Sequence, residues 1–390
     1  MSETKGIQAN GLLPQLSMLT VTRVIINTGY RMIYPLLPVF TRELNVSDAS
    51  FAILLTVLQL TGLSAPLMGQ VSERQGRRFT MLMGLGMYIA GMMLVFLSPN
   101  FPGLAAALII AAFGKISFDP ALQAYIGDRV PYQKRGFYLG VLEFGWAGAY
   151  VVGVPIMTWL MAQSNWQIPF GVLAILTGIC FLIAFFMLER DKPEQRTGVS
   201  FFQVVRQSVN SPIALAGLAL GFGISGANQL ITYVFGFWIE ASFGIQLTAL
   251  AAASFVIGLS ELGGEGIVTT ISDRFGKRRL VIVAIIGNIL ACLILPFTAI
   301  NLTVALAGLF FFYLTFETGL VATIPLASEL SPLARGMYMT VFVAAVTFGR
   351  TLATPIAPML FEWGLMANTV AAIGFNLIAL VAVWRYIRVE

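Results

Sequence analysis

Residues 69–78 read GQVSERQGRR and separate two apolar runs, each long enough to cross a bilayer. A glycine, an acid and several bases in this order suit a tight turn between two helix ends. Gly76 permits the turn because it lacks a Cβ atom. Acids favour the start of the following helix, and bases favour the end of the preceding one. Bases also keep a loop in the cytoplasm, so the stretch predicts a short cytoplasmic loop between two membrane-spanning helices.

The same pattern returns 200 positions further along the chain. Residues 271–278 read ISDRFGKR, against VSERQGRR at 71–78, and an aspartate replaces the glutamate. Two further anchors share this offset, an Arg-Gly-x-Tyr pattern and a proline: residues 135–138 with 335–338, and Pro155 with Pro355. Three anchors at one offset predict two structural halves related by an internal repeat.

The composition is that of an integral membrane protein. Hydrophobic residues make up 58% of the chain and charged residues only 11%, whereas soluble domains are about 25% charged. The net charge of +5 does not indicate nucleic-acid binding, because the bases fall in short loops between apolar runs. Cys180 and Cys292 lie singly inside apolar runs, so we expect buried thiols and no metal site. The chain has no histidine, the commonest proton shuttle near neutral pH.

Apolar runs of about 20 residues predict twelve spans and an all-α membrane protein. The spans are 14–40, 51–71, 79–98, 103–127, 136–161, 167–188, 212–239, 247–270, 280–300, 302–327, 336–360 and 365–387. The longest polar stretch, 189–211, predicts a cytoplasmic linker between an N-terminal six-helix bundle at 1–188 and a C-terminal one at 212–390. Its FFQVVRQ segment suits either a helix on the membrane surface or an unstructured linker.

The bases also predict the orientation. With the N-terminus inside, 18 of the 23 lysines and arginines fall in inner loops and tails, and the outer loops hold only Arg42. We therefore expect a multi-pass protein of the inner or plasma membrane with both termini in the cytoplasm.

The repeated loop resembles the signature loop of the major facilitator superfamily, a Gly-x-Leu-Ala-Asp-Arg-x-Gly-Arg-Arg pattern between the second and third spans. The first copy matches at Gly69, Glu73, Arg74, Gly76, Arg77 and Arg78, and the second at Asp273, Arg274, Gly276, Lys277 and Arg278. The resemblance covers nearly the whole chain and is nearest to the drug:proton antiporter branch. It implies a major facilitator fold of two pseudo-symmetric six-helix bundles, and a secondary transporter that works by alternating access.

Nine charged residues fall well inside the spans, where a charge costs about 2.5–3.5 kcal/mol at the bilayer centre. They are Arg23, Arg31, Lys115, Asp119, Glu143, Glu261, Glu265, Glu317 and Arg350. The spans 79–98, 167–188, 280–300 and 365–387 carry none of these nine, only Arg385 near the cytoplasmic end of the last, and are expected to face lipid. Structural pairing is an alternative to function for some of these charges: Lys115 with Asp119 at i, i+4, and Arg23 with Glu143.

Candidate site residues follow from these charges and from polar or aromatic residues at similar depth. Expected cargo contacts are Asn27, Tyr30, Arg31, Tyr34, Lys115, Trp146, Tyr150, Asn228, Gln229, Tyr233 and Arg350. Expected proton carriers are Asp119, Glu143, Glu261 and Glu317, since a desolvated carboxyl can exchange protons near neutrality. The resemblance implies a conformational gate at Gly69, Glu73, Arg74, Gly76, Arg78, Arg135, Asp273, Arg274, Gly276, Arg278 and Arg335.

The leading functional hypothesis is proton-coupled efflux of amphiphilic small molecules. One alternative is proton-coupled uptake or facilitated passage of a small organic anion, clamped by arginine and lysine. Another is a membrane sensor that does not transport. The glycines show no nucleotide-binding pattern, and no constellation of catalytic or metal-ligating residues indicates an enzyme. We expect a monomer in the lipid bilayer, with a small-molecule substrate, protons as the coupling ion, and no cofactor, metal or nucleic acid.

Overall fold

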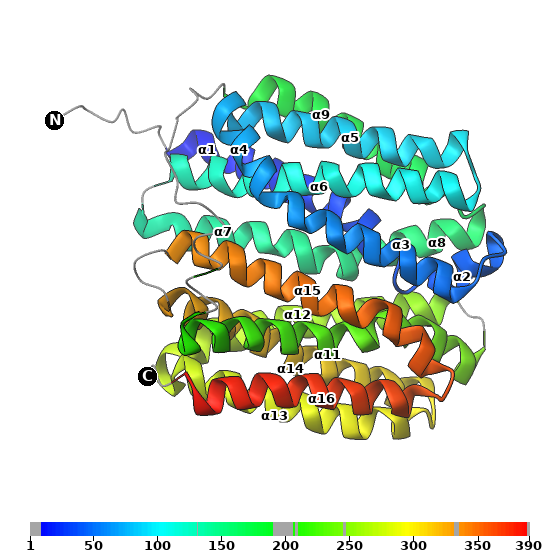
Figure 1. The fold of residues 1–390 in the computed structure, drawn as a ribbon. Coiled ribbons are helices and arrows are strands. Elements are labelled where there is room, and N and C mark those ends of the chain that lie inside the picture. The colour runs from blue at the N-terminus through cyan, green and yellow to red at the C-terminus, as the bar shows by residue number, and fades with distance from the viewer. Residues whose placement is uncertain are drawn as a thin grey trace. The chain divides into compact units, whose positions relative to one another are not determined.

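The computed structural model describes residues 9–130, 132–189, 206, 210–244, 247–330 and 335–387. Throughout these ranges the chain forms helices and their connections, with no strand. It divides into two compact units (Figure 1). Unit 1 comprises Met1–Met32 and Ser64–Arg196, and unit 2 comprises Ile33–Leu63 and Thr197–Glu390. The segment 33–63 therefore lies with the C-terminal helices, although it belongs to the first half of the sequence.

Unit 1 is built from seven α-helices of the described chain and one π-helical turn. They are α1 (Ala9–Arg31), α4 (Ala65–Gln75), α5 (Arg77–Leu97), α6 (Phe101–Arg129), α7 (Tyr132–Gly148), the π-helical turn η2 (Ala149–Gly153), α8 (Val154–Gln163) and α9 (Ile168–Met187). Helix α5 packs on α6 and α9, and α1 packs on α7 and α9. Small residues allow this close approach: a Cβ atom at Gly84 or Gly91 would lie 2.5 Å from a carbonyl oxygen of α6.

In unit 2, α11 is the central helix and packs against α14, α15 and α16. Its elements are α2 (Leu37–Glu43), α3 (Asp48–Thr61), the start of the 3-10 turn η1 (Gly62–Ser64), α11 (Pro212–Phe243), α12 (Leu247–Phe275), α13 (Lys277–Ile294), the 3-10 turn η3 (Leu295–Thr298), α14 (Leu302–Glu329), α15 (Arg335–Phe361) and α16 (Leu365–Arg385). The segment 33–63 contributes α2 and α3, which pack on α11 and α15.

Ten helical spans of the described chain are long and apolar enough to cross a membrane. An eleventh results if Leu37–Glu43 and Asp48–Ser64, bent by 119°, count as one broken span. Helix α1 is not among them, because Arg23, Asn27 and Arg31 lower its hydropathy. The predicted number of twelve is therefore not confirmed, whereas the all-helical membrane architecture is. The predicted linker at 189–211 lies almost entirely outside the described residues.

The repeated turn has the predicted backbone in both copies. Gly76 has φ 97° and Gly276 has φ 89°, conformations that side chains disfavour. Arg74 and Arg274 lie in the last turns of α4 and α12, as expected for bases near a helix C-terminus.

Two other arginines of the repeated turns, Arg78 and Arg278, contact the ends of other helices. Arg78 Nη2 donates to the carbonyl oxygen of Phe185 near the end of α9. Arg278 Nη2 donates to that of Trp384 near the end of α16, at 2.9 Å. Both arginines thus satisfy carbonyls that have no intrahelical partner, and each does so within its own unit.

The base before each of these arginines forms an ion pair with an acid near the end of a long helix. Arg77 Nε lies 3.4 Å from Asp128 Oδ2 in α6, and Lys277 Nζ lies 2.8 Å from Glu329 Oε1 in α14. The internal repeat therefore extends from the sequence to the contacts that hold each turn in place.

Gly276→Ala should lower the stability of the protein by about 1–3 kcal/mol, because only glycine adopts its backbone conformation without strain. A Cβ atom there would meet no other atom within 4 Å, so a steric clash contributes nothing. The matched control is Gly266→Ala in α12, which also has open space around it but a helical backbone. Thermal unfolding in detergent should show a lower midpoint for Gly276→Ala and an unchanged or higher one for Gly266→Ala. Equal midpoints would contradict the backbone explanation.

Candidate functional site

A polar seam joins α1 to α7 in unit 1. Arg23, Asn27 and Arg31 recur at every fourth position and so lie on one face of α1. Arg23 Nη1 donates to the carbonyl oxygen of Leu142 at 2.8 Å, and Asn27 Nδ2 to that of Gly145 at 3.0 Å. Arg31 Nη1 donates to the carbonyl oxygen of Trp146, also at 3.0 Å.

Glycines on the facing helix make this seam possible. A Cβ atom at Gly145 would lie 2.8 Å from Arg23 Cβ, and one at Gly153 would lie 1.8 Å from Thr28 Oγ1. The bare backbone therefore lets α1 approach closely enough for its polar side chains to reach main-chain carbonyls.

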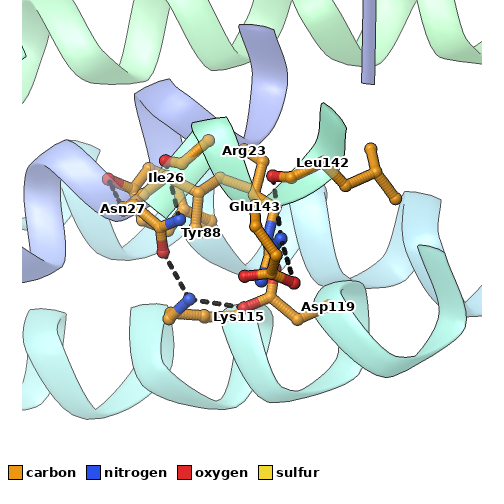
Figure 2. Close-up of polar contacts among 9 residues, drawn as sticks. Arg23, Ile26, Asn27, Tyr88, Lys115, Asp119, Leu142 and Glu143 are labelled. Atoms are coloured by element: carbon orange, nitrogen blue, oxygen red, sulfur yellow. Dashed lines mark hydrogen bonds and ion pairs between the residues drawn. The ribbon is translucent and has the colours of Figure 1, made fainter. Parts of the chain in front are cut away.

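Two cations and two carboxylates form a connected cluster at this seam (Figure 2). Arg23 Nη1 lies 2.9 Å from Glu143 Oε1, and Arg23 Nε lies 3.6 Å from Asp119 Oδ1. Lys115 Nζ donates to both Asp119 and Asn27. The alternative pairings anticipated from the sequence, Arg23 with Glu143 and Lys115 with Asp119, are both confirmed. Because each buried charge faces an opposite one, the cluster offsets much of its desolvation cost.

The two carboxylates of the cluster differ in access. The Glu143 side chain is 44% exposed, whereas that of Asp119 is 18% exposed. Asp119 faces two cations, but its Oδ1 atom accepts no hydrogen bond from the described residues. Glu143 is therefore the accessible end of the cluster, and Asp119 is its enclosed centre.

Aromatic rings surround the neighbouring arginine. The Arg31 guanidinium lies 3.6 Å from the Tyr150 ring centroid and 4.2 Å from that of Trp146. Lys115 Nζ lies 5.5 Å from the Trp146 centroid and 5.9 Å from that of Tyr30. Six predicted cargo contacts thus come together in unit 1: Asn27, Tyr30, Arg31, Lys115, Trp146 and Tyr150.

A break in regular helix geometry positions Tyr150. It lies in the π-helical turn η2, which ends two residues before Pro155 in the first turn of α8. Proline has no N–H to donate to a preceding carbonyl, and a π turn accommodates that loss. The wider turn changes the direction of the Tyr150 side chain relative to a continuous α-helix.

The remaining predicted cargo contacts lie in unit 2, and two tyrosines there have structural contacts. Tyr233 Oη donates to the carbonyl oxygen of Asp48 at 2.6 Å, and Tyr34 Oη accepts from Gln59 Nε2 at 3.4 Å. The Tyr233 hydroxyl thus joins α11 to the start of α3, and the Tyr34 hydroxyl joins the turn before α2 to α3. Asn228 and Gln229 are buried on α11.

Two predicted proton carriers are buried in unit 2. Glu261 lies on α12 and Glu317 on α14. A Cβ atom at Gly264 would lie 2.8 Å from Glu317 Cβ, so the two helices touch one turn from Glu261. Arg350 is half-buried on α15, which packs on α14.

The predicted gate residues other than Arg135 and Arg335 lie around the two repeated turns. Gly69, Glu73 and Arg74 belong to α4, and Arg274 belongs to α12. The side chains of Arg135, Asp273 and Arg335 lie outside what the structure describes. Arg78 and Arg278 satisfy helix ends in this conformation, and their part in gating stays a prediction.

The contacts that hold the segment 33–63 against the C-terminal helices were not predicted from the sequence. Gln59 Nε2 donates to Thr354 Oγ1 at 2.9 Å, and Arg42 pairs with Glu240. A Cβ atom at Gly236 would lie 2.7 Å from the carbonyl oxygen of Pro35. A single amide such as Gln59 in an apolar run does not indicate a contact by itself, because its partner Thr354 lies nearly 300 residues away. In the described part of the chain, no three acids or cysteines gather as a metal site would require.

The chain is similar to known membrane transporters in sequence and in fold. A model described as Major Facilitator Superfamily matches residues 19–325. An uncharacterized MFS-type transporter, YceJ, of Bacillus subtilis (strain 168) is 26% identical over 343 residues, covering 87% of each chain. Multidrug resistance protein MdtG of Proteus mirabilis (strain HI4320) is 28% identical over 261 residues, covering 64% of this chain and 63% of MdtG.

Solved structures of transporters share the fold. A D-xylose-proton symporter superposes with a TM-score of 0.75 at 18% identity, covering 96% of this chain and 98% of the symporter. A bacterial homolog of the human lysosomal transporter Spinster superposes with a TM-score of 0.76 at 15% identity, covering 98% of each chain. The chain therefore belongs to the major facilitator superfamily of membrane transporters.

Proposed function

We propose that this transporter exports amphiphilic small molecules in exchange for protons, by alternating access. The single observation that carries this proposal is the unit 1 cluster, in which an accessible carboxylate, Glu143, shares an arginine with an enclosed one, Asp119. The similarity to MdtG, which is named a multidrug resistance protein, supports efflux. The aromatic rings around Arg31 and Lys115 add apolar surface suited to an amphiphile.

The proton step takes place at Glu143. A proton on this carboxyl removes its negative charge and weakens its contact with Arg23 Nη1. Asp119 Oδ1 lies 3.6 Å from Arg23 Nε, so the guanidinium can shift to it by a small movement and gain a charge-assisted hydrogen bond. Arg23 thus alternates between two carboxylates, and its position on α1 couples the proton to the helix that also carries Arg31.

The second candidate function is uptake or facilitated passage of a small organic anion. The guanidinium of Arg31 favours it, because stacking on Tyr150 and a bond to the Trp146 carbonyl hold that guanidinium in one orientation. An arginine fixed in this way can bind a carboxylate through two parallel hydrogen bonds.

For either function we propose a monomer with two six-helix halves. We also propose that both termini lie in the cytoplasm, since the bases concentrate in the loops on the same side as the termini.

Proteoliposomes with the membrane potential clamped test these functions with three probes. They are tetraphenylphosphonium, a lipophilic cation; chloramphenicol, a neutral amphiphile; and lactate, a small organic anion. We expect either amphiphile to accumulate only under a pH gradient. Lactate movement that ignores the gradient would favour the second candidate. Thermal stabilisation by a probe without any flux would indicate a sensor.

Glu143→Gln should abolish gradient-driven accumulation and leave probe binding intact, because glutamine mimics the protonated carboxyl and cannot release a proton. We expect gradient-driven flux to fall by about a hundredfold or more, as for removal of an essential proton-transfer group. The matched control is Glu362→Gln, a carboxylate exposed after α15, which should transport normally. Unchanged gradient-driven flux in Glu143→Gln would refute Glu143 as the proton carrier.

A further inference from the structure

One face of α11 carries an uncharged polar stripe. Ser225, Asn228, Gln229 and Thr232 occupy positions i, i+3, i+4 and i+7 and therefore share this face. The first three are buried in unit 2, with relative exposures of 0%, 5% and 2%. In a helix that is otherwise apolar over long stretches, three buried polar side chains in two turns need partners.

A chain of hydrogen bonds sets the direction of the Asn228 amide. Thr232 Oγ1 donates to Asn228 Oδ1 at 3.1 Å. The Thr232 hydroxyl has one hydrogen, so the 2.9 Å contact with Tyr313 Oη from α14 is donated by the tyrosine. With its oxygen engaged in this way, Asn228 turns its NH₂ group away from Thr232.

Three buried donor atoms on this stripe have no hydrogen-bond partner among the described residues. They are Ser225 Oγ, Asn228 Nδ2 and Gln229 Nε2. A buried donor without an acceptor is strongly unfavourable, because it has lost water and gained nothing in return. Three such atoms within two turns of one helix indicate a surface that completes its hydrogen bonds with a bound molecule.

We propose that Ser225, Asn228 and Gln229 form a donor face that binds uncharged oxygen acceptors of the cargo. This inference rests on the proposed transport function and names the part of its substrate class that uses this face, neutral amphiphiles with hydroxyl, carbonyl or nitro oxygens. Hydroxyl and amide groups orient such oxygens without adding charge. A site built to donate hydrogen bonds disfavours analogues that lack acceptors, because its own polar groups then stay unpaired. Lipophilic cations without oxygen are therefore poor ligands of this face.

Removal of these donors should weaken the binding of oxygen-bearing cargo without lowering the thermal midpoint of the ligand-free protein. Gln229→Met keeps the shape of the side chain and removes an unpaired donor, so it should leave the thermal midpoint of the ligand-free protein unchanged or raise it. The same variant should weaken chloramphenicol binding by about tenfold and leave tetraphenylphosphonium binding within about twofold. Ser225→Ala, a smaller change, should shift both quantities in the same directions.

The matched control is Asn288→Leu on α13. Asn288 is buried too, but its amide donates to the Phe312 carbonyl at 2.9 Å and its oxygen accepts from Asn376 Nδ2 at 2.8 Å. Asn288→Leu should therefore lower the thermal midpoint and leave chloramphenicol affinity unchanged in the folded protein.

Binding is measured on the purified full-length protein by equilibrium dialysis and thermal shift, without a proton gradient. Absence of chloramphenicol binding to the unsubstituted protein overturns the donor face. So does a Gln229→Met protein that loses stability like Asn288→Leu and binds chloramphenicol unchanged, the result expected if these side chains only hold the fold. Donor-dependent binding without gradient-driven flux would support the donor face and refute proton-coupled transport instead.

Discussion

A Gly62→Cys, Thr347→Cys protein will stop transporting when its two thiols are oxidised and will recover when the disulfide is reduced. Gly62 follows α3 in the segment 33–63, and a Cβ atom there would lie 3.5 Å from Thr347 Cγ2 in α15. Because Cγ2 branches from the Thr347 Cβ as the Sγ of a cysteine would, a thiol at position 347 can approach one at position 62 closely enough to form a disulfide. Cys180 and Cys292 are buried and are replaced by alanine in all variants.

The expected block follows from where the segment 33–63 lies. It precedes most of the N-terminal half in sequence, yet Gln59, Arg42 and the Pro35 carbonyl contact helices of the C-terminal half. If the two halves rock against each other, these contacts must break in every cycle. A covalent bond between α3 and α15 prevents that separation and should reduce flux to the level of protein-free liposomes.

The control disulfide joins two helices of the C-terminal half alone. In Gly287→Cys, Thr315→Cys, the Cβ atoms of α13 and α14 lie 3.6 Å apart. Both helices lie in unit 2 and follow residue 212, so rocking does not require them to separate. Oxidation should leave this variant active. Full transport by a completely cross-linked Gly62–Thr347 protein would show that the segment 33–63 does not separate from α15 during the cycle.

Arg23→Met should destabilise the protein by about 3 kcal/mol, the lower end of the range for breaking a buried ion pair. The substitution removes the cation between Asp119 and Glu143 and the hydrogen bond to the Leu142 carbonyl. The lower end applies because Glu143 is 44% exposed and water can partly solvate it. Transport should be lost as well, since Arg23 is the group that the two carboxylates share.

A double-mutant cycle isolates the charge effect from the change in packing. Arg23→Met with Glu143→Gln removes both members of the pair and should be more stable than Arg23→Met alone. Arg42→Met is the matched control: its arginine is 42% exposed and pairs with Glu240, so the loss should be at most about 1 kcal/mol. Thermal and mixed-detergent unfolding measure the unsubstituted protein, Arg23→Met, Glu143→Gln, the double variant and the control. Additive losses in the cycle would mean that Arg23 contributes through packing and not through charge.

The internal repeat preserves the turns between helices but not the charged side chains of the cluster. Both turns bind the end of a neighbouring helix through an arginine, Arg78 in one unit and Arg278 in the other. The charged cluster has no such copy: Arg23, Lys115, Asp119 and Glu143 correspond by offset to Gly223, Thr315, Gly319 and Val343. The unmatched polar chemistry of unit 2 is the uncharged donor face of α11. Each unit therefore combines a common frame with side chains of its own.

Local features of the sequence determined much of this protein. Apolar runs predict membrane helices because burial in lipid depends on each run alone. The turn at Gly76 and Gly276 follows from the backbone freedom of one residue, and Lys115 meets Asp119 because four positions bring two side chains to one face. The stripe of Ser225, Asn228 and Gln229 also has helical spacing, so its shared face was readable from the sequence.

Only the tertiary structure decided which of these features meet and which stay without partners. Thr354 lies 295 positions from Gln59, and nothing in either apolar run indicates the other. The approach of α1 to α7 depends on bare backbone at Gly145 and Gly153 meeting Arg23 and Thr28 across two helices. The physical reason is that spanning a membrane is a property of one helix, whereas pairing depends on the shapes and hydrogen bonds of two. The unpaired donors of α11 are visible only once every neighbouring helix is in place.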